Sequence, residues 1–269
     1  MVEAQGIAGF ARLRQVFATE GVGIEMTSAL RVETHSSCAS CTVRQSNFCG
    51  ALLADSQLPR APRQLTQEHM FSRARRTIAF TGEASDSVIM ICEGWAISFI
   101  QLPDGRRQIL SVLLPGDLVS VASLFDRRQQ TAVQTLTDVS YCLYHRLDVL
   151  QKLMAEPPVM DALGAITIAE KQEADALLMD LGRRTAEERI ALLILRLLDR
   201  LGRRNLARGD VVNFPLRQQH IADITGLTPV HVNRTLGNFR RDGILEISDC
   251  VLKILDMHAL RRLGETRCP

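Results

Sequence analysis

The sequence predicts an α+β protein in which an antiparallel β-structure, a long helix and a compact helical domain with a β-wing follow one another. Three observations support this prediction. Short β-type runs separated by turn residues fill the segment from about residue 60 to residue 144. The apolar period changes to that of a helix after Pro157-Pro158. Near the carboxyl end, two short helical segments meet at Gly226, and a hairpin-like segment follows them.

Length and charge limit the classes of function. The chain has 269 residues, enough for two ordinary domains with their own cores, and its formal net charge is +2. A nucleic-acid site must therefore be a local patch. No apolar run approaches the ~18 residues of a membrane helix, and the amino terminus lacks the pattern of a signal peptide. We expect a cytoplasmic protein with no membrane partner, in which thiols stay reduced.

The β-type runs are short and closely spaced. They are Ser87–Cys92, Trp95–Gln101, Gln108–Leu114 and Thr131–Tyr144, with turn residues at 102–105 and 115–117. This spacing is typical of a sandwich or a barrel. The predicted division is an extension with a cysteine cluster (1–57), a β-domain (58–156), a long helix (157–182) and a carboxyl-terminal domain (183–269).

Residues 159–181 repeat apolar side chains at helical spacing. The stripe comprises Val159, Leu163, Ile166, Ala174, Leu177, Leu178 and Leu181. Glu170 and Glu173 interrupt it. Such a helix is either a core element of its own chain or the spine of a dimer, and the pattern leaves both open. A second helix is expected to begin after the N-cap Thr185 and to end at Gly202.

Residues 217–241 read RQQHIADITGLTPVHVNRTLGNFRR and predict a helix-turn-helix. Gly226 supplies the positive φ that a tight turn between helices requires. Thr228 is the expected N-cap of the second helix, and Pro229 occupies the first helical position, where its missing N–H costs nothing. The segments ILEI and VLKIL, separated by SDC, predict a two-stranded wing. The side chains expected to be buried are Ile221, Ile224, Val232, Leu236 and Phe239.

The exposed face of the second helix suits the reading of base edges in a DNA major groove. It presents Val230, His231, Asn233, Arg234 and Asn238. Arg217, Gln218, Arg240 and Arg241 can meet phosphates. Any helical hairpin with a glycine turn shares part of this pattern, but the cap, the buried spacing, the basic ends and the wing together favour DNA binding. The predicted DNA-binding residues are Arg217, Gln218, Thr228, His231, Asn233 and Arg234. No nucleophile–base pair or phosphate loop indicates an enzyme.

Cys38, Cys41 and Cys49 form a C-x₂-C-x₇-C pattern in a polar segment. Thiolates at such spacing can hold zinc or an iron–sulfur cluster. The spacing leaves zinc, iron–sulfur and thiols that bind nothing as alternatives. His35 is a local candidate for a fourth ligand, and Cys92, Cys142, Cys250 and Cys268 are distant ones. Cys92 lies inside an apolar run, so core packing is its expected role.

These segments together resemble the Crp/Fnr superfamily and, within it, the oxygen-sensing fumarate-and-nitrate-reduction branch. The resemblance spans about residues 30–265 and rests on DGRRQILSVLLPGDLVS, RRTAEERIA and the helix-turn-helix with its wing. It implies an antiparallel β-roll, which is a jelly-roll of the cyclic-nucleotide-binding type, then a dimerisation helix and a winged helix-turn-helix. The implied dimer spine comprises Leu163, Ile166, Glu170, Glu173, Ala174, Leu177 and Leu181.

The same resemblance implies a [4Fe-4S] cluster. The segment QTLTDVSYCLYHRLDVL looks like the one that carries the family's fourth ligand, which makes Cys142 the partner of Cys38, Cys41 and Cys49. The implied function is an oxygen- or redox-responsive transcription regulator whose cluster controls dimerisation and promoter binding. The homodimer would bind palindromic TTG-type half-sites in double-stranded DNA and act on RNA polymerase. The alternative is a regulator of the same kind with structural zinc or inert cysteines and no response to oxygen.

Two departures from the superfamily refine these expectations. Val121 stands where the cyclic-AMP-binding branch has a glutamate, and Thr131-Ala132 stand where it has an Arg-Ser pair. A cyclic phosphate would lack its counter-charge, so no cyclic nucleotide is expected. In the recognition helix, Val230 replaces the usual glutamate and Asn233 the usual small residue, while Arg234 matches the family arginine, which can read a guanine.

Overall fold

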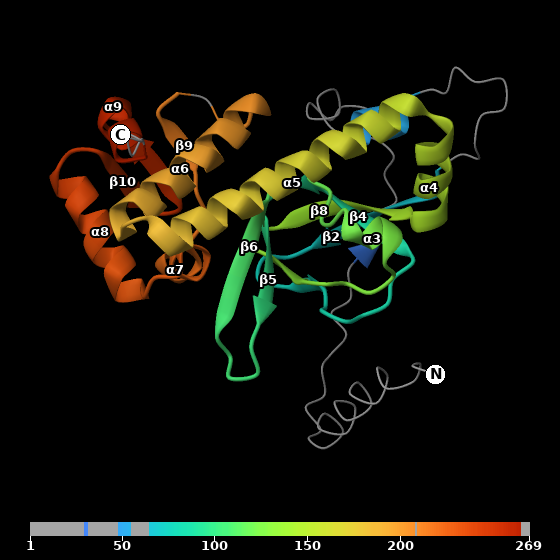
Figure 1. Ribbon diagram of the computed structural model, residues 1–269, viewed down its shortest axis with the longest axis horizontal. Helices are drawn as coiled ribbons and strands as arrows, with labels where there is room; N and C mark the ends of the chain where they lie inside the picture. The colour runs from blue at the N-terminus through green and yellow to red at the C-terminus, as the bar shows by residue number, and fades with distance from the viewer. Residues whose placement is uncertain (1–29, 32–47, 55–64, 208, 265–269) are drawn as a thin grey trace, which may run out of the picture.

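The structure is a computed structural model that describes residues 30–31, 48–54, 65–207 and 209–264. These residues form an antiparallel β-roll, a long helix and a carboxyl-terminal domain of helices with a small sheet (Figure 1). This is the α+β architecture that the sequence predicts. Most of the predicted extension, residues 1–57, lies outside the described part of the chain, and with it Cys38 and Cys41.

Two four-stranded antiparallel sheets form the β-roll. The first has the order β1-β2-β8-β4 and comprises β1 (Leu30–Arg31), β2 (Gln67–Ser72), β8 (Val139–His145) and β4 (Ser87–Glu93). The second has the order β3-β7-β5-β6 and comprises β3 (Thr77–Ala79), β7 (Ala132–Thr135), β5 (Ala96–Gln101) and β6 (Arg107–Leu113). Alternate side chains of both sheets, among them Ile91, Val133 and Tyr141, fill the space between them.

The predicted single run Thr131–Tyr144 is two strands in different sheets. The chain leaves β7 at Thr135 and enters β8 at Val139, so it crosses from the second sheet to the first. The crossing passes close to Gly94, whose φ is +84° and where a Cβ would lie 2.2 Å from the carbonyl oxygen of Asp138. The prediction of one run is wrong because both strands have the same residue preferences. They differ only in the neighbouring strands with which each of them pairs, and these come from other parts of the sequence.

Helices cover the outer face of the first sheet. They are α2 (Phe48–Leu53), α3 (Ala122–Phe125), α4 (Arg146–Ala155) and the first half of α5 (Pro157–Arg183). Side chains from these helices pack with outward-facing side chains of β4 and β8 in one apolar cluster, which includes Phe48, Met90, Cys142, Tyr144 and Leu163. The Nζ atom of Lys152 in α4 donates to the carbonyl oxygens of Leu52 (2.5 Å) and Ala54 (3.0 Å) and so ties the end of α2 to the roll.

The long helix α5 runs from Pro157 to Arg183 and confirms the predicted helix, including the apolar stripe at 159–181. The two prolines lie in its first turn, where a missing N–H leaves no bond unmade. At about 1.5 Å per residue, its 27 residues span roughly 40 Å, from the outer face of the roll to the carboxyl-terminal domain (Figure 1). None of the helices in the described part of the chain is both long and apolar enough to cross a lipid bilayer.

The carboxyl-terminal domain surrounds the predicted helix-turn-helix. Its elements are α6 (Ala186–Arg203), β9 (Val211–Asn213), α7 (Gln218–Thr225), α8 (Pro229–Arg241), β10 (Leu245–Ser248), β11 (Val251–Ile254) and α9 (Met257–Gly264). Thr185 caps α6 as predicted, in a reciprocal pair with Glu188. Gly202 does not end α6, because the helix continues to Arg203 and the left-handed residue beyond it is Asn205. The predicted two-stranded wing is extended by β9 to the order β10-β11-β9.

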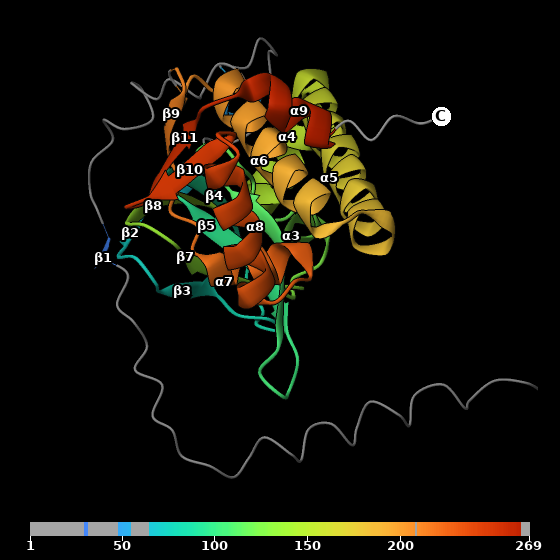
Figure 2. The ribbon, with the colours of Figure 1, turned by 90° about the vertical axis from the view of Figure 1, so that its left-hand side faces the viewer.

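This domain packs on the outer face of the second sheet. Trp95, Ile97, Phe99 and Ile109 of the β-roll share one apolar cluster with the core of the carboxyl-terminal domain. The rings of Trp95 and Phe214 meet edge to face, with centroids 6.5 Å apart. Figure 2 shows the carboxyl-terminal elements lying against the roll, so the two domains share a core.

Candidate DNA-binding surface and cysteine site

The turn between α7 and α8 has the geometry that its sequence predicts. Gly226 adopts φ 64° and ψ 29°, and its N–H donates to the carbonyl oxygen of Ala222. The positive φ is the reason that glycine is needed here; a Cβ would also lie 2.8 Å from Leu181 Cδ2, a side-chain end that could shift. Leu227 packs against the core between the helices. The helix-turn-helix prediction is confirmed at the level of the backbone.

The start and the buried face of α8 follow from its capping residues. The Thr228 hydroxyl accepts a hydrogen bond from the His231 N–H at 3.3 Å, and Pro229 is the first helical residue. Val232 and Phe239 are buried as predicted, and Leu236 is half-buried. Thr235 is also buried, which the predicted apolar spacing does not include. A small threonine can face the core between two larger apolar side chains. A prediction that considers only the spacing of apolar residues does not include it.

The predicted base-reading side chains lie on the exposed face of α8. His231, Asn233 and Arg234 are exposed, and Val230 is 76% exposed. The Gln218 amide donates to the Asn233 side-chain oxygen at 3.1 Å, so the start of α7 lies beside α8 on this surface. Arg217 is exposed just before α7. The structure therefore places Arg217, Gln218, Asn233 and Arg234 on one side of the domain.

Two further arginines predicted to meet phosphates have partners within the chain. Arg240 forms an ion pair with Glu246 of β10 at 3.3 Å, and Arg241 forms one with Asp242 at 3.3 Å. Both arginine side chains are largely exposed. Exposed pairs of this kind are weak, so either arginine can exchange its partner for a phosphate. The wing turns at Asp249-Cys250, both with positive φ, which is the backbone of a type I′ hairpin turn.

A half-buried ion pair joins the helix-turn-helix to the β-roll. The Arg107 guanidinium in β6 contacts the Asp223 carboxylate in α7 at 2.7 Å. The next side chain, Gln108, donates to the carbonyl oxygen of Ile224 at 3.1 Å. Burial and the nearby Arg107 charge lower the pKa of His220, which lies one turn before Asp223. The sequence gives no signal for these contacts, because the partners lie 116 residues apart.

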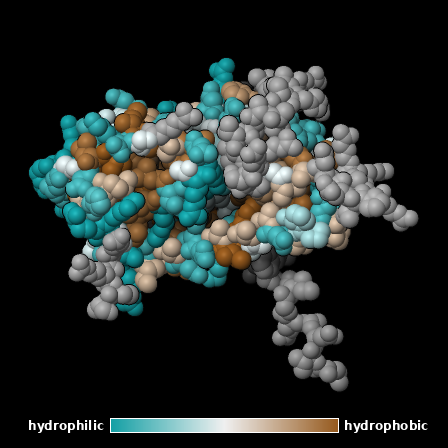
Figure 3. Space-filling view, turned by 90° about the horizontal axis from the view of Figure 1, so that it is seen from above, coloured by the Kyte–Doolittle hydropathy of each residue, from teal (hydrophilic) through white to brown (hydrophobic). Residues whose placement is uncertain are grey.

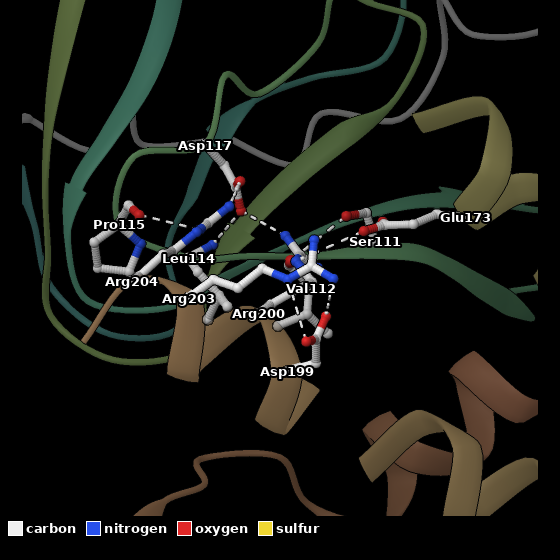
Figure 4. Close-up of polar contacts among 10 residues, drawn as sticks. All are labelled: Ser111, Val112, Leu114, Pro115, Asp117, Glu173, Asp199, Arg200, Arg203 and Arg204. Atoms are coloured by element: carbon white, nitrogen blue, oxygen red, sulfur yellow. Dashed lines mark hydrogen bonds and ion pairs between the residues drawn. The ribbon is translucent and has the colours of Figure 1, made fainter. Parts of the chain in front are cut away.

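A second set of ion pairs joins α6 to the turn after β6 (Figure 4). Arg200 contacts Asp117 at 2.7 Å, and Arg204 contacts the other oxygen of the same carboxylate. Arg204 also donates to the carbonyl oxygen of Pro115 at 3.0 Å. Glu173 of α5 completes the set, with its carboxylate 3.6 Å from Arg200 Nε. The turn Pro115-Gly116-Asp117, predicted only as punctuation between strands, is therefore a link between the two domains.

The contacts of α5 within its own chain bear on the predicted dimer spine. Leu163 is buried in the β-roll cluster of its own chain, and Ile166 packs against that cluster. Glu173 pairs with Arg200 of its own chain. Leu163 therefore faces the core of its own chain, whereas Ile166 is half-buried and the Glu173 side chain is 47% exposed, so their place in a dimer spine stays a prediction. Of the other predicted residues, Glu170 and Ala174 are exposed, and Leu177 and Leu181 are half-buried.

A different face of α5 carries exposed apolar side chains. Met160, Ile168, Leu178 and Met179 are all exposed; Gly164, Lys171 and Asp175 lie between them along that face, and Gly182 follows. Their spacing of three or four residues puts them on one side of the helix, opposite the face that packs on the roll. Lys171 and Asp175 form an ion pair on this side. In the space-filling view from above, apolar patches interrupt a mostly hydrophilic surface (Figure 3).

Two of the four predicted cluster ligands lie in the described part of the chain. Cys142 is 1% exposed on β8, and Cys49 lies on α2, with its sulfur 3.8 Å from the Tyr144 hydroxyl. Cys142 and Tyr144 are two residues apart on the same face of β8, so both cysteines border the same apolar cluster. Cys38, Cys41 and the zinc candidate His35 lie outside the described residues. Among the described residues alone, no group of three His, Cys, Asp or Glu side chains is arranged to hold a metal ion.

Cys92 has a more specific environment than the core position predicted for it. Its side chain is half-buried, and its sulfur lies 3.1 Å from that of Cys142. Cys142 Sγ also lies 3.4 Å from His69 Nδ1 on β2. Register explains the meeting: His69 and Met90 are the two cross-strand partners of Cys142, and the register shifts between Ile91 and Glu93. Cys92 lies two residues after Met90, at this shift, and on the same face of the sheet as Cys142.

Comparison with known proteins agrees with this architecture. The family model described as a cyclic nucleotide-binding domain matches residues 70–156, and the one described as a Crp-like helix-turn-helix domain matches residues 188–263. The chain is 30% identical over 227 residues to the transcriptional activatory protein AadR of Rhodopseudomonas palustris, covering 84% of this chain and 90% of that protein. It is 28% identical over 215 residues to the transcriptional activator protein FnrL of Cereibacter sphaeroides, covering 78% and 84%.

A solved structure shows the same fold. FixK2 from Bradyrhizobium japonicum superposes with a TM-score of 0.68 at 27% identity, covering 76% of this chain and 99% of that one. These relatives are regulators rather than enzymes, in agreement with the prediction. The two matched domains, their order and the relatives together show that the chain belongs to the Crp/Fnr family of DNA-binding transcription regulators.

Proposed function

We propose that this regulator responds to oxygen or redox state through a [4Fe-4S] cluster held by Cys38, Cys41, Cys49 and Cys142. The observation that carries the proposal is the meeting of Cys49 on α2 with the outer face of β8, next to Cys142. The two are 93 residues apart in sequence, yet both border one apolar cluster. Four thiolates are the ordinary ligands of such a cluster.

The surroundings of these two cysteines fit the donor set. Phe48, Met90 and Tyr144 border them, and an apolar surround limits access of water to an iron–sulfur centre. Lys152 fixes α2 by its bonds to Leu52 and Ala54, and so positions the segment that carries Cys49. When bound, the cluster would supply a redox-sensitive link between the amino-terminal cysteines and the β-roll. Its loss would release the amino-terminal segment from Cys142.

The regulator is proposed to act as a homodimer on palindromic DNA. Arg234 is proposed to bind a guanine edge in each TTG-type half-site, with Arg217 and Gln218 on the phosphate backbone. The unpartnered face of α5, with Ile168 and Leu178, is proposed to meet the same face of a second copy. Relatives named as activators support activation through RNA polymerase, and the proposed location is the cytoplasm.

We propose no cyclic nucleotide as effector. Val121 is buried in the apolar cluster and offers no acceptor for a ribose hydroxyl. Thr131 is hydrogen-bonded to Ser98 at 2.8 Å and supplies no cation for a phosphate.

Iron and sulfide content test the cluster. Full-length protein reconstituted under anaerobic conditions should contain close to four iron and four sulfide per chain, as expected for one [4Fe-4S] cluster. Cys142→Ser should abolish oxygen-responsive regulation, while Cys250→Ser, in the exposed wing turn, should keep it. Stoichiometric zinc without sulfide would contradict the proposal and favour a regulator with a structural metal.

A further inference from the structure

Cys92 and Cys142 form a sulfur pair across two neighbouring strands. Their Sγ atoms are 3.1 Å apart, on β4 and β8 of the first sheet. A disulfide needs an S–S distance of about 2.05 Å, so the two sulfurs must approach by about 1 Å. The register shift between Ile91 and Glu93 lies at Cys92, where the strand is less constrained by its ladder. A rotation of the two side chains is therefore the main movement required.

We propose that Cys92 and Cys142 are a reversible dithiol–disulfide pair, a second redox site that shares Cys142 with the proposed cluster. The oxidant is hydrogen peroxide, and Cys92 is its point of attack because its side chain is half-buried, whereas Cys142 is 1% exposed. Disulfides that form inside cells are commonly transient and redox-sensing.

The chemistry proceeds in two balanced steps. The Cys92 sulfur attacks one peroxide oxygen, an S–O bond forms as the O–O bond breaks, and one water leaves. The Cys142 sulfur then attacks the oxidised Cys92 sulfur, an S–S bond forms as the S–O bond breaks, and a second water leaves. Two thiols have lost two electrons, and hydrogen peroxide has been reduced to two waters. A dithiol reductant reverses the change.

The consequence for regulation rests on the proposed function. Cys142 is the proposed fourth cluster ligand, and its sulfur cannot bind iron while it is bonded to Cys92. Peroxide would therefore lock the cluster-free protein in that state until a reductant restores the thiols. Such a lock would make reassembly of the cluster depend on the thiol pool as well as on iron and sulfide.

The test uses full-length, iron-free protein treated with hydrogen peroxide and digested without reductant. Mass spectrometry should find the peptides of Cys92 and Cys142 joined, with the loss of two hydrogens, and dithiothreitol should separate them. Cys92→Ser should abolish the joined peptide, and Cys92→Ala should do the same if serine perturbs folding. Cys250→Ser is the matched control and should keep it. Absence of the joined peptide in the wild type, or pairing of Cys142 with another cysteine alone, would overturn the proposal.

The same preparations separate this inference from the cluster. A protein that forms the Cys92–Cys142 bond but binds no iron contradicts the cluster and supports the sulfur pair. A protein that binds iron and sulfide but forms no bond supports the cluster and refutes the pair.

Discussion

The Arg107 guanidinium in the β-roll and the Asp223 carboxylate in the helix-turn-helix meet at 2.7 Å, with only 20% and 10% of their side chains exposed. The Arg107 guanidinium also lies 5.2 Å above the centre of the Phe99 ring. Asp223 belongs to α7, which the Gly226 turn holds against the recognition helix. This one ion pair therefore connects the second sheet of the β-roll to the helix that packs against the proposed DNA-reading helix.

Arg107→Ala is expected to lower the free energy of unfolding by about 2–3 kcal/mol, because it leaves the Asp223 carboxylate largely buried without its cation. Arg107→Ala/Asp223→Ala should lose less than the sum of the two single variants, since the double variant has no orphan charge. Urea denaturation of the four proteins measures this coupling. Arg106→Ala is the matched control, because the Arg106 side chain is 77% exposed on the hairpin tip and should matter little. Additive single effects would show that the contact contributes nothing.

Arg234 and Arg217 lie on the same surface but are predicted to have different roles in DNA binding. Arg234→Ala should weaken binding to the specific site by roughly 1–3 kcal/mol and flatten discrimination at one G:C pair of each half-site. Arg217→Ala should weaken binding to DNA of any sequence by a similar amount. It should also reduce the salt dependence of binding, because a phosphate contact releases counterions. Binding assays on single-base variants of the site at several salt concentrations measure both. If the Arg234→Ala protein still discriminated fully between bases, Arg234 would not be a base-reading residue.

The helix-turn-helix was predictable because its signals are local. The N-cap Thr228, Pro229 and the positive-φ Gly226 each lie within a few residues of the backbone they shape. The strands of the β-roll were predictable as runs but not as sheets. The crossing between Thr135 and Val139 depends on contact with Gly94, about 40 residues earlier.

The exposed face of α5 and the contact of Cys92 were less predictable, because both depend on residues that are distant in the sequence. On α5, Leu163 and Ile168 are similar apolar residues, yet one is buried in the roll and the other is exposed. Periodicity finds an apolar stripe, but the strands that cover it come from elsewhere in the sequence. Cys92 was predictable as a strand residue, whereas its contact with Cys142 depends on a register shift that has no sequence signature.

The contribution of Glu170 to the stability of the fold should depend on pH. Although the residue as a whole is exposed, desolvation of its carboxyl group raises its pKa, and nearby Glu173 and Asp117 raise it further, against the lowering effect of a hydrogen bond from the Val121 backbone. The contribution of Glu170 to stability is then fully present below the ordinary glutamate pKa of about 4.3 and is lost as pH rises through the raised value. Glu170→Gln should therefore be more stable than the wild type at neutral pH, with a difference that shrinks as pH falls. Urea denaturation between neutral and acid pH measures it, and a difference that does not change with pH would contradict the assignment.

The last prediction concerns the exposed face of α5. A dimer would place two recognition helices roughly 34–36 Å apart, one turn of DNA, while a monomer meets a single half-site. Ile168→Glu should weaken the dimer by about tenfold or more, equivalent to ~1.4 kcal/mol, because it buries a charge in the proposed interface, and binding to a palindrome should fall with it.

Leu147→Glu is the matched control, since Leu147 is exposed on α4, away from this face. Glu173→Ala should not promote dimerisation, because Glu173 pairs with Arg200 of its own chain rather than with its symmetry mate. Sedimentation of cluster-loaded and air-exposed protein measures each effect. Unchanged dimerisation of Ile168→Glu, or a dimer gained in air by Glu173→Ala, would return the interface to the face that the sequence alone suggested.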